Sequence, residues 1–457
     1  MNRYVVVLAA GQGTRMKSKL YKVLHPVAGK SMVDHVVSQA EEIQPEKIVT
    51  VVGCGAEKVQ SLLQDRVEYA LQEEQLGTGH AVLQTAPMLE GKEGTTLVIC
   101  GDTPLLQAST LQALFEEHEA SKAKATILSA FMEDPTGYGR IVRDENGAVQ
   151  KIVEQKDATE EEKAIQEINT GTYCFDNEAL FTMLHQVGND NAQGEYYLPD
   201  VIGLLQNAGE KVSAHIMEDP EESLGVNDRV ALAKANQSMF LRNAIAHMRN
   251  GVTIVDPSHT YIENDVVIGA DTVIEPNVQL KGKTVIGSDC FIGSNSVIVD
   301  SELADEVAIY ASHLEQAKVG RGSDVGPMAR LRPNAELKER VHIGNFVEVK
   351  NATIGNGTKA GHLAYIGDAT LGENINVGCG AIFVNYDGVN KHHSDIEDGA
   401  FIGSNANIVS PVHVGKDAFI AAGSTINKDV PSEAMAIARE RQTNKEEYVH
   451  QLPQFKK

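Results

Sequence analysis

The 457-residue sequence contains no tryptophan, and aromatic residues make up only 5% of it. Much of the chain therefore cannot pack around large aromatic side chains, and the 40 glycines favour closely stacked aliphatic layers. Basic residues are also few, since 40 Lys and Arg stand against 63 Asp and Glu, for a net charge of −23. This balance argues against a general nucleic-acid binder, which needs a basic face. It does not exclude an anionic substrate, because a local cluster of Lys and Arg can override the mean field.

Cysteines and long apolar runs are equally scarce. Five cysteines lie at positions 54, 100, 174, 290 and 379, and no two are close enough for a CxxC motif. Neither a zinc knuckle nor a small disulfide framework is indicated, and isolated thiols fit a reducing cytoplasm. The apolar run at residues 4–10 is too short for a secretory signal, and no stretch approaches about 18 uninterrupted apolar residues. We expect a cytoplasmic protein with no membrane insertion and no nucleic-acid partner.

The first half of the chain has the rhythm of an α/β domain. Short apolar runs alternate with amphipathic segments of helical length, which predicts a mainly parallel sheet with ligands beyond the carboxyl ends of its strands. The strand candidates are residues 4–10, 48–52, 96–99, 125–130 and 172–175, and the helix candidates include residues 32–43, 57–63 and 110–120.

A strong helix candidate covers residues 228–250. Asp228 can cap its start, and Gly251 follows it as a stop signal. At a rise of 1.5 Å per residue the helix would be about 35 Å long, enough for a rigid arm between domains.

After Gly251 the pattern changes to a repeat in which Ile, Val or Leu is followed by Gly. These glycines lie at 269, 287, 293, 320, 326, 344, 355, 367, 372, 378, 403 and 415. Most spacings are multiples of six or within one of them, and the spacings of 27 and 25 suggest inserted loops. A six-residue repeat indicates a parallel β-helix with three short strands per coil and one small aliphatic residue per repeat pointing inward. A β-sandwich would instead need turns about every 8 to 12 residues.

These patterns divide the chain into four predicted parts. They are a Rossmann-like α/β domain over 1–227, a helical linker over 228–250, a β-helix over 251–437 and a tail over 438–457.

The run LAAGQGTRM (residues 8–16) directly follows the first strand candidate. Gly11 and Gly13 allow the backbone to approach a phosphate with its N–H groups, and Arg15 adds a charged donor. Taken alone, a Gly-rich turn after a strand is more often simple turn chemistry than a ligand loop.

Two familiar nucleotide motifs are excluded here. Met16 occupies the third glycine position of a dinucleotide fingerprint, and residues 48–52 end without the acidic residue that would hold a ribose. The GKS at residues 29–31 is not the end of a P-loop, because Leu24 stands where the leading glycine is required.

The longer pattern closely resembles the sugar-1-phosphate nucleotidyltransferases. After LAAGQGTRM and Lys22, further motifs of that family follow in order: QEEQLGTGHA (72–81), CGDTPLL (100–106), GYGRI (137–141), VEQKD (153–157), NTG (169–171) and GVND (225–228). The resemblance implies in-line attack by a sugar-1-phosphate oxygen on the α-phosphorus of UTP. Arg15 and Lys22 would neutralise charge together with Mg²⁺, and no protein nucleophile is needed.

The same resemblance implies the ligands of this first site. Residues expected to bind UTP or its sugar product are Leu8, Ala9, Ala10, Gly11, Lys22, Gln72, Gly77, Thr78, Gly139, Glu154, Asn169 and Asn227. Asp102 follows a buried strand candidate and is a natural Mg²⁺ ligand, and the resemblance adds Asn227 as the second. Two simpler interpretations stay open, since Asp102 could be a turn residue before Pro104 and Asn227 could form an Asx turn. Thr103 stands where the family commonly has Val.

Five motifs interrupt the β-helix repeat: ARLRPNAEL (329–337), VEVKN (347–351), KAGHLAYIGD (359–368), NVGCGAIFVNYDG (376–388) and IGSNANIV (402–409). They resemble the acetyltransferase half of the bacterial bifunctional enzymes that make UDP-N-acetylglucosamine, so the resemblance covers nearly the whole chain. It implies a left-handed β-helix, acetyl-CoA and UTP as cosubstrates, and a product used in cell-wall precursor synthesis.

This second resemblance implies another set of residues. His362 is the expected general base, because an amine must lose a proton to attack a thioester, and Glu348 is expected to orient it. Residues expected to bind glucosamine-1-phosphate are Arg332, Lys350, Tyr365 and Asn376, and those expected to bind acetyl-CoA are Asn385, Tyr386, Ser404, Ala422 and Arg439. Without the surrounding KAGHxxYxGD, His362 would be an ordinary surface or core histidine, as we expect His392 and His393 to be. Cys379 replaces a common Ala.

A β-helix is a three-sided prism, and three prisms packed around an axis bury one face of each. We therefore expect a homotrimer with acetyl-transfer sites built from more than one chain. Two alternatives stay open. One is a monofunctional pyrophosphorylase with an inert β-helix, and the other is a non-catalytic scaffold like the pyrophosphorylase-like subunits of a eukaryotic translation exchange factor. The set His362, Asn385, Tyr386 and Lys350 argues against the first, and the set Arg15, Lys22, Asp102 and Asn227 against the second.

Overall fold

The computed structural model describes residues 2–191 and 193–455. The chain divides into two compact units, Met1–Met239 and Phe240–Lys457, and the division falls inside helix α9 (Arg229–Arg249). The helix begins where its cap predicts, because Asp228 Oδ1 accepts hydrogen bonds from the Val230 and Ala231 amides at 2.9 and 2.8 Å. It is followed by Gly251, whose φ of 93° ends the helix at low cost.

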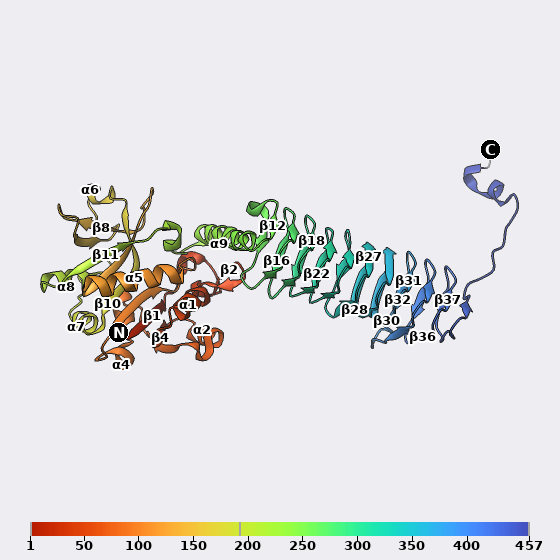
Figure 1. The fold of residues 1–457 in the computed structure, drawn as a ribbon, viewed down its shortest axis with the longest axis horizontal. Coiled ribbons are helices and arrows are strands. Elements are labelled where there is room, and N and C mark those ends of the chain that lie inside the picture. The colour runs from red at the N-terminus through yellow and green to blue at the C-terminus, as the bar shows by residue number, and fades with distance from the viewer. Residues whose placement is uncertain (1, 192, 456–457) are drawn as a thin grey trace. The chain divides into compact units, whose positions relative to one another are not determined.

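The first unit contains a mixed sheet with the strand order β11-β7-β10-β6-β1-β4-β5, and β8 and β9 attach beside β10 (Figure 1). Its strands are β1 (Arg3–Ala9), β4 (Lys47–Val52), β5 (Glu68–Leu71), β6 (Thr95–Cys100), β7 (Ala125–Phe131), β8 (Gly139–Arg143), β9 (Val149–Val153), β10 (Glu167–Asp176) and β11 (Val212–Ile216). Its helices are α1 (Met32–Glu42), α2 (Ala56–Leu63), α3 (Thr78–Leu83), α4 (Ala86–Leu89), α5 (Ala108–Ser121), α6 (Glu160–Lys163), α7 (Asn177–Leu184) and α8 (Asp200–Asn207). A small hairpin joins β2 (Pro26–Val27) to β3 (Lys30–Ser31).

The predicted strands and helices of this unit are confirmed, but its sheet is mixed and not mainly parallel, because β8, β9 and β10 form antiparallel pairings. β1 pairs in parallel with both β4 and β6, whereas β10 runs antiparallel to β6 and β7. Side chains of β1 alternate between two cores, with Val5 and Val7 facing α1 and α5 while Tyr4 and Val6 face α7 and α8. The chain turns to opposite sides of β1, to β4 and to β6, and such a switch point opens a crevice at the carboxyl ends of the strands.

The second unit is a parallel β-helix, as predicted (Figure 1). One of its sheets, the β12–β39 sheet, consists of β12 (Thr253–Ile254), β15 (Val273–Ile274), β18 (Phe291–Ile292), β21 (Ala308–Ile309), β24 (Asp324–Val325), β27 (His342–Asn345), β29 (Lys359–His362), β31 (Asn376–Val377), β34 (Phe401–Ile402), β37 (Phe419–Ile420) and β39 (Met435–Ala436).

The other two sides of the coil are joined in the β13–β38 sheet. It consists of β13 (Tyr261–Ile262), β14 (Val267–Ile268), β16 (Gln279–Lys281), β17 (Val285–Ile286), β19 (Val297–Val299), β20 (Glu302–Leu303), β22 (His313–Glu315), β23 (Lys318–Val319), β25 (Arg330–Leu331), β26 (Ala335–Leu337), β28 (Glu348–Ile354), β30 (Tyr365–Leu371), β32 (Ile382–Val384), β33 (Ser394–Ile396), β35 (Asn407–Val409), β36 (His413–Val414) and β38 (Thr425–Ile426).

Aliphatic side chains fill the coil. Each short strand points one residue inward, such as Ile274, Ile292 and Ile309, and Phe383 is the one aromatic residue of this core among the described residues. Inward Ile, Val and Leu therefore account for the scarcity of aromatics, and each fully buried side chain contributes about 1.5–3 kcal/mol.

One of the two expected loops is real and the other is not. Residues 385–393 form an insertion between β32 and β33, closed by an antiparallel bridge from Tyr386 to Lys391. The 27-residue spacing after Gly293 contains uninterrupted strands instead, because Ala304 and Tyr310 occupy corner positions where the preceding coil has glycine. The glycine repeat is interrupted between Gly293 and Gly320 because a corner of the coil does not always require glycine.

The chain after β39 leaves the stacked coils and is largely exposed (Figure 1). Its described part contains the short 3₁₀ turns Tyr448–Gln451 and Pro453–Phe455. Among the described residues, no helix has the length and apolarity required to cross a membrane.

Gly355, which follows β28, provides a test of coil packing. A Cβ at Gly355 would lie 2.4 Å from the carbonyl carbon and oxygen of Gly372, whereas a Cβ at Gly361 would have no neighbour closer than 3.9 Å. We expect Gly355→Ala to destabilise the coil by about 2 kcal/mol and to lower its unfolding midpoint by about 4–8 °C. Calorimetry of the full chain measures this shift, with Gly361→Ala as the matched control. Equal midpoints for the two variants would contradict the tight stacking.

Candidate active sites

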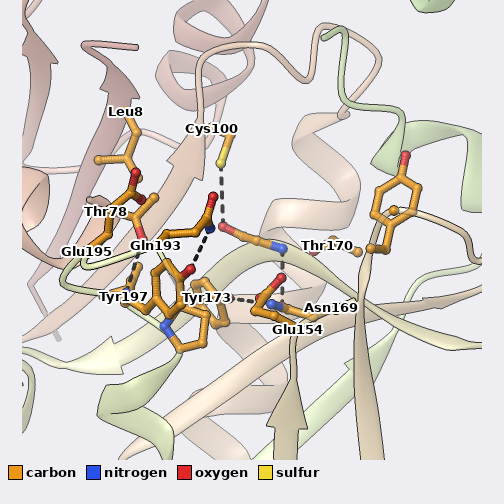
Figure 2. A pocket seen from close by; sticks show the side chains of 16 residues that line it. Leu8, Thr78, Cys100, Glu154, Asn169, Thr170, Tyr173, Gln193, Glu195 and Tyr197 are labelled. Atoms are coloured by element: carbon orange, nitrogen blue, oxygen red, sulfur yellow. Dashed lines mark hydrogen bonds between the residues drawn. The ribbon is translucent and has the colours of Figure 1, made fainter. Parts of the chain in front are cut away.

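Two adjoining hollows lie beyond the carboxyl ends of β1 and β6 in the first unit, and Figure 2 shows the first of them. Their volumes are about 310 and 350 Å³, each within the range of small-molecule sites. They share the lining residues Leu8, Thr78, Cys100 and Glu195. A ligand with two chemically different halves could therefore occupy both at once.

The Gly-rich loop after β1 lies against Lys22. Gly13 has a φ of 63°, and a Cβ there would lie 2.5 Å from the Lys22 Cβ, so this close approach requires glycine. Ala10, Gly11 and Lys22 line the second hollow, as the sequence predicts. Ala9 differs, because its side chain is buried in the core beneath the sheet and leaves only backbone for a ligand.

Lys22 brings together residues from three parts of the chain. Its Nζ lies 2.5 Å from Asp102 Oδ2 and 3.0 Å from Asn227 Oδ1, and Arg15 Nη2 donates to the same Asn227 oxygen at 3.1 Å. The Lys22 and Asp102 side chains are only 15% and 16% exposed. Two oxygens from distant segments thus converge on one cation, at the edge of the hollow that Asp102 and Lys22 line.

Asp102 is held by the turn that follows β6. The Thr103 hydroxyl donates to the Cys100 carbonyl at 2.8 Å, and the Val226 amide donates to the Asp102 carbonyl at 2.9 Å. Thr103, which replaces the more common Val, therefore satisfies its own polar group while closing the turn.

The second hollow is walled by Gln72, Gly77 and Thr78. Gln72 is only 3% exposed, and its Nε2 bonds the Gly77 carbonyl at 3.1 Å and His80 Nδ1 at 3.0 Å. Gly77 has a φ of 113°, a conformation that L side chains rarely adopt. The carboxamide is thus fixed in one orientation, which suits recognition of a planar base.

The first hollow gathers Gly139, Glu154 and Asn169 (Figure 2). Asn169 is positioned by a bulge in β10, where its Nδ2 donates to the Tyr173 hydroxyl at 2.7 Å. A Cβ at Gly139 would lie 3.0 Å from Glu154 Oε1, so glycine leaves room for the carboxylate. Burial raises the pKa of Glu154. These groups suit the hydroxyls and amide of a sugar.

Several lining residues were not predicted from the sequence. Cys100, Tyr173, Gln193, Glu195 and Tyr197 line the hollows, and the dense aromatic and acidic run at residues 195–200 was the available signal. Burial raises the pKa of the Cys100 thiol to about 12, which keeps it protonated.

Arg140 was also not singled out. It is 1% exposed, and it donates to the carbonyls of Tyr138 and Lys163 and to Gln155 Oε1. Gln155 Oε1 also accepts from the Gly137 amide at 3.3 Å. The guanidinium therefore ties the turn before Gly139 to the segment after β9, on both sides of the first hollow.

A second group of predicted site residues lies on and beside the β13–β38 sheet of the coil. Arg332 pairs with Glu348 at 2.9 Å, and Tyr365 Oη accepts from Asn385 Nδ2 at 3.3 Å. Asn385 also donates to Asp368, which accepts from Asn351 at 2.6 Å. The structure thus brings together four of the predicted residues and adds a buried amide–carboxylate network.

A cationic cluster lies beside this network. Contact with Lys391, together with desolvation and the charge of Arg332, lowers the pKa of Lys350. Lys391 comes from the inserted loop and was not predicted, because sequence spacing does not show where a loop residue lands. Cations held this close together favour a multiply charged anion.

A corner of the coil carries the predicted His362 and acetyl-CoA residues. Leu363 N donates to the Asn345 carbonyl, Asn405 N to the Cys379 carbonyl, and Gly423 N to the Ser404 carbonyl, each at 2.7–2.9 Å. These bonds align a corner column, which comprises Asn345, His362, Cys379, Ser404, Ala422 and Arg439 on successive coils. Cys379 is an exposed free thiol in this column.

The structure differs from expectation at His362. Its Nδ1 bonds Asn345 Oδ1 at 2.8 Å, while the expected partner, Glu348, instead accepts from Arg332. Glu348 lies on the β13–β38 sheet, where one coil step brings it beside the arginine. Two other predicted residues stand apart in the single chain, since Asn376 pairs with Lys359 on the β12–β39 sheet and Tyr386 is 56% exposed.

Comparisons with known proteins agree with this two-part architecture. The family model described as Nucleotidyl transferase matches residues 4–222, and the model described as Bacterial transferase hexapeptide (six repeats) matches residues 260–300 and 393–428. Three relatives named Bifunctional protein GlmU are similar over the full length. That of Enterococcus faecalis (strain ATCC 700802 / V583) is 62% identical over 455 residues, covering 100% of this chain and 99% of the relative.

The other two relatives match almost as well. The protein of Latilactobacillus sakei subsp. sakei (strain 23K) is 60% identical, and that of Geobacillus sp. (strain WCH70) is 59% identical, each over 99% of this chain and 98% of the relative. With nucleotide- and sugar-sized hollows in one unit and a cationic, His-bearing coil in the other, the chain belongs to the bifunctional GlmU family of enzymes, which join a nucleotidyltransferase and an acetyltransferase in one polypeptide.

Proposed function

We propose that the enzyme performs its two reactions at the two sites described above. The coil acetylates glucosamine-1-phosphate with acetyl-CoA, and the first unit then transfers uridylyl from UTP to N-acetylglucosamine-1-phosphate, releasing pyrophosphate. The convergence of Asp102, Asn227 and Arg15 around Lys22, beside two adjoining hollows, carries the second assignment. The product, UDP-N-acetylglucosamine, feeds cell-wall precursor synthesis.

Uridylyl transfer requires positioning and charge neutralisation. A sugar-phosphate oxygen attacks the α-phosphorus of UTP, the bond to the β-phosphate oxygen breaks, and pyrophosphate carries away the electron pair. Lys22 lines the hollow where the triphosphate would enter and lies against Gly13, and Arg15 is tied to the same cluster through Asn227. Their guanidinium and ammonium groups hold the phosphates in line and offset the charge on the leaving group.

Asp102 and Asn227 fit a Mg²⁺ ion. Both supply hard oxygen ligands, and these two oxygens already bind the same cation, the Lys22 ammonium group. Mg²⁺ commonly takes few protein ligands and completes its shell with water and phosphate oxygens. When bound, the metal would supply further neutralisation of the triphosphate charge. With those two oxygens on the metal, Lys22 would be available to bond a phosphate oxygen.

The hollows divide substrate recognition between them. Gln72, Gly77 and Thr78 bind uracil in the hollow that Leu8–Gly11 border, while Gly139, Glu154 and Asn169 bind the sugar hydroxyls and N-acetyl group. The rigid Gln72 carboxamide supports base recognition, because its donors are held by Gly77 and His80.

Acetyl transfer uses the coil. His362 takes a proton from the glucosamine amine as the amine attacks the thioester carbonyl, and the C–S bond then breaks to release CoA. Arg332, Lys350 and Tyr365 bind the sugar phosphate, and the nearby Lys391 adds a further cation. The corner column of Ser404, Ala422 and Arg439, with Asn385 and Tyr386, lines a path for acetyl-CoA that starts beside His362.

The acetyl-transfer site is completed between subunits of a cytoplasmic homotrimer. Bulky apolar residues at consecutive corners, Met328, Phe346 and Leu363, are 63%, 54% and 57% exposed and have positive φ. Exposed apolar ladders of this kind favour burial against another chain. Asn376 lies on a different sheet from Tyr365, which supports a site to which a neighbouring chain contributes Asn376. Free cysteines at all five positions fit a reducing compartment.

Arg140 tests the sugar side of the first site. We expect Arg140→Lys to raise the KM for N-acetylglucosamine-1-phosphate about tenfold, because an ammonium cannot make the three separated bonds of the guanidinium. The KM for UTP should stay within about twofold, since Gln72 and Lys22 are untouched. Steady-state kinetics measure both. Arg143→Lys, on the same strand but paired with Glu167, is the control, and equal effects of the two changes would refute the assignment.

Two substitutions test the separation of the sites. Asp102→Asn should lower uridylyl transfer at least about 100-fold and leave acetyl transfer within about twofold. His362→Ala should do the reverse, because the base is removed only from the coil. Pyrophosphate and CoA release, assayed separately on each variant, measure the two rates. Parallel loss of both activities in a folded variant would be inconsistent with independent sites.

The oligomeric state can be read from sedimentation. Wild-type protein should sediment as a trimer, and Phe346→Glu should dissociate it and lower acetyl transfer while uridylyl transfer persists. An active monomeric acetyltransferase would disprove the shared site.

A further inference from the structure

Asn345 and His362 are direct partners on adjacent coils. They are paired in register between β27 and β29, and the Leu363 amide donates to the Asn345 carbonyl at 2.9 Å. Just before them the coils approach so closely that a Cβ at Gly344 would lie 1.9 Å from the Gly361 carbonyl oxygen. The distance between Asn345 and His362 is therefore set by backbone stacking, not by a mobile loop.

The hydrogen bond between their side chains determines the proton on the imidazole. His362 Nδ1 lies 2.8 Å from Asn345 Oδ1. An amide oxygen only accepts, so Nδ1 must carry the hydrogen, and the lone pair of the neutral ring is on Nε2. The ring is thus held in a single tautomer and a single orientation.

We propose that Asn345 is a positioning residue for acetyl transfer, which selects the tautomer of His362 with Nε2 free to take the proton of the amine. The inference rests on the proposed role of His362 as the base. Asn345 acts through His362 and does not itself contact the reacting atoms.

A neutral partner suits this task better than a carboxylate. A carboxylate at position 345 would favour the protonated ring, which cannot act as a base, whereas an amide orients the ring without adding charge. The carboxylate expected to orient the ring, Glu348, is paired with Arg332 at 2.9 Å, and the corner on the next coil carries Cys379. The ring therefore has an orienting partner that adds no charge.

The backbone on either side supports the pair. Phe346 and Leu363, which directly follow Asn345 and His362, have φ values of 59° and 42°. Non-glycine residues in the left-handed region are uncommon and are maintained where the surrounding structure demands them. Here they follow the two members of the pair on adjacent coils, whose side chains bond across the step between the coils.

The first experiment replaces Asn345 by Ala in the full-length enzyme. We expect kcat for acetyl transfer to fall at least about tenfold, with both KM values and uridylyl transfer within about twofold. Asn407→Ala is the control, because Asn407 also bonds a residue on the next coil, Thr425, away from the corner column. In ¹⁵N-histidine-labelled protein, the His362 ring shifts should report Nδ1–H in the wild type and a tautomer mixture in Asn345→Ala.

The second experiment uses Asn345→Asp. The Asp side chain has nearly the same shape as Asn, so this variant tests the inference even if Asn345→Ala fails to fold. Its carboxylate should move the acid limb of the kcat profile for acetyl transfer upward by about one pH unit, because a nearby negative charge stabilises the protonated ring and a higher pH is needed to free the base. Wild-type kcat and ring shifts in Asn345→Ala, or an unmoved limb in Asn345→Asp, would overturn the inference while leaving His362 as the base. Full acetyl transfer by His362→Ala would instead overturn the proposed function itself.

Discussion

Parallel pairing of strands determines where the chemistry lies in both halves of this enzyme. In the first unit, β1 pairs in parallel with β4 and β6, so the segments that follow β1 and β6 leave the sheet at the same edge. The Gly-rich loop and Asp102 meet there for that reason. In the coil, parallel stacking places residues about one coil apart in direct contact, and the pair Asn345 and His362 results.

Local charge in both sites opposes the charge of the whole molecule. Against a net charge of −23, Lys22 and Arg15 converge at the first site and Lys350, Lys391 and Arg332 at the second. Crowding of these like charges costs free energy, as the lowered pKa of Lys350 beside Lys391 indicates. A phosphate relieves that repulsion when it binds. On the proposed function, these two local clusters bind small phosphorylated substrates despite the acidic net charge of the chain.

Much of this architecture could be predicted from the sequence, because its two periodicities are strong. The apolar runs located β1, β4, β6, β7 and β10 to within a few residues, and the six-residue repeat predicted the coil. The hollows contain most of the predicted nucleotide and sugar ligands, because those residues lie next to strand ends whose positions are fixed by pairing.

What could not be predicted depends on register and on side-chain direction. Successive coils differ in length, as shown by the 17-residue step from Asn345 to His362 and the 25-residue step from Asn376 to Phe401, so spacing alone does not identify neighbours. Glu348 was therefore expected beside His362, whereas it pairs with Arg332. Arg140 was missed because the spacing of residues in the sequence does not show that its guanidinium is buried against backbone carbonyl groups. Lys391 was missed because the direction of an inserted loop depends on its own bridge to Tyr386.

The central claim is that one polypeptide supplies the residues of two catalytic sites whose reactions follow one another. The most direct test supplies purified enzyme with glucosamine-1-phosphate, acetyl-CoA, UTP and Mg²⁺, and measures all three products over time. The account predicts UDP-N-acetylglucosamine, CoA and pyrophosphate in equal final amounts, with CoA released first. Pyrophosphate that forms only when the acetylated sugar phosphate is supplied from outside would contradict it, as would the absence of any product.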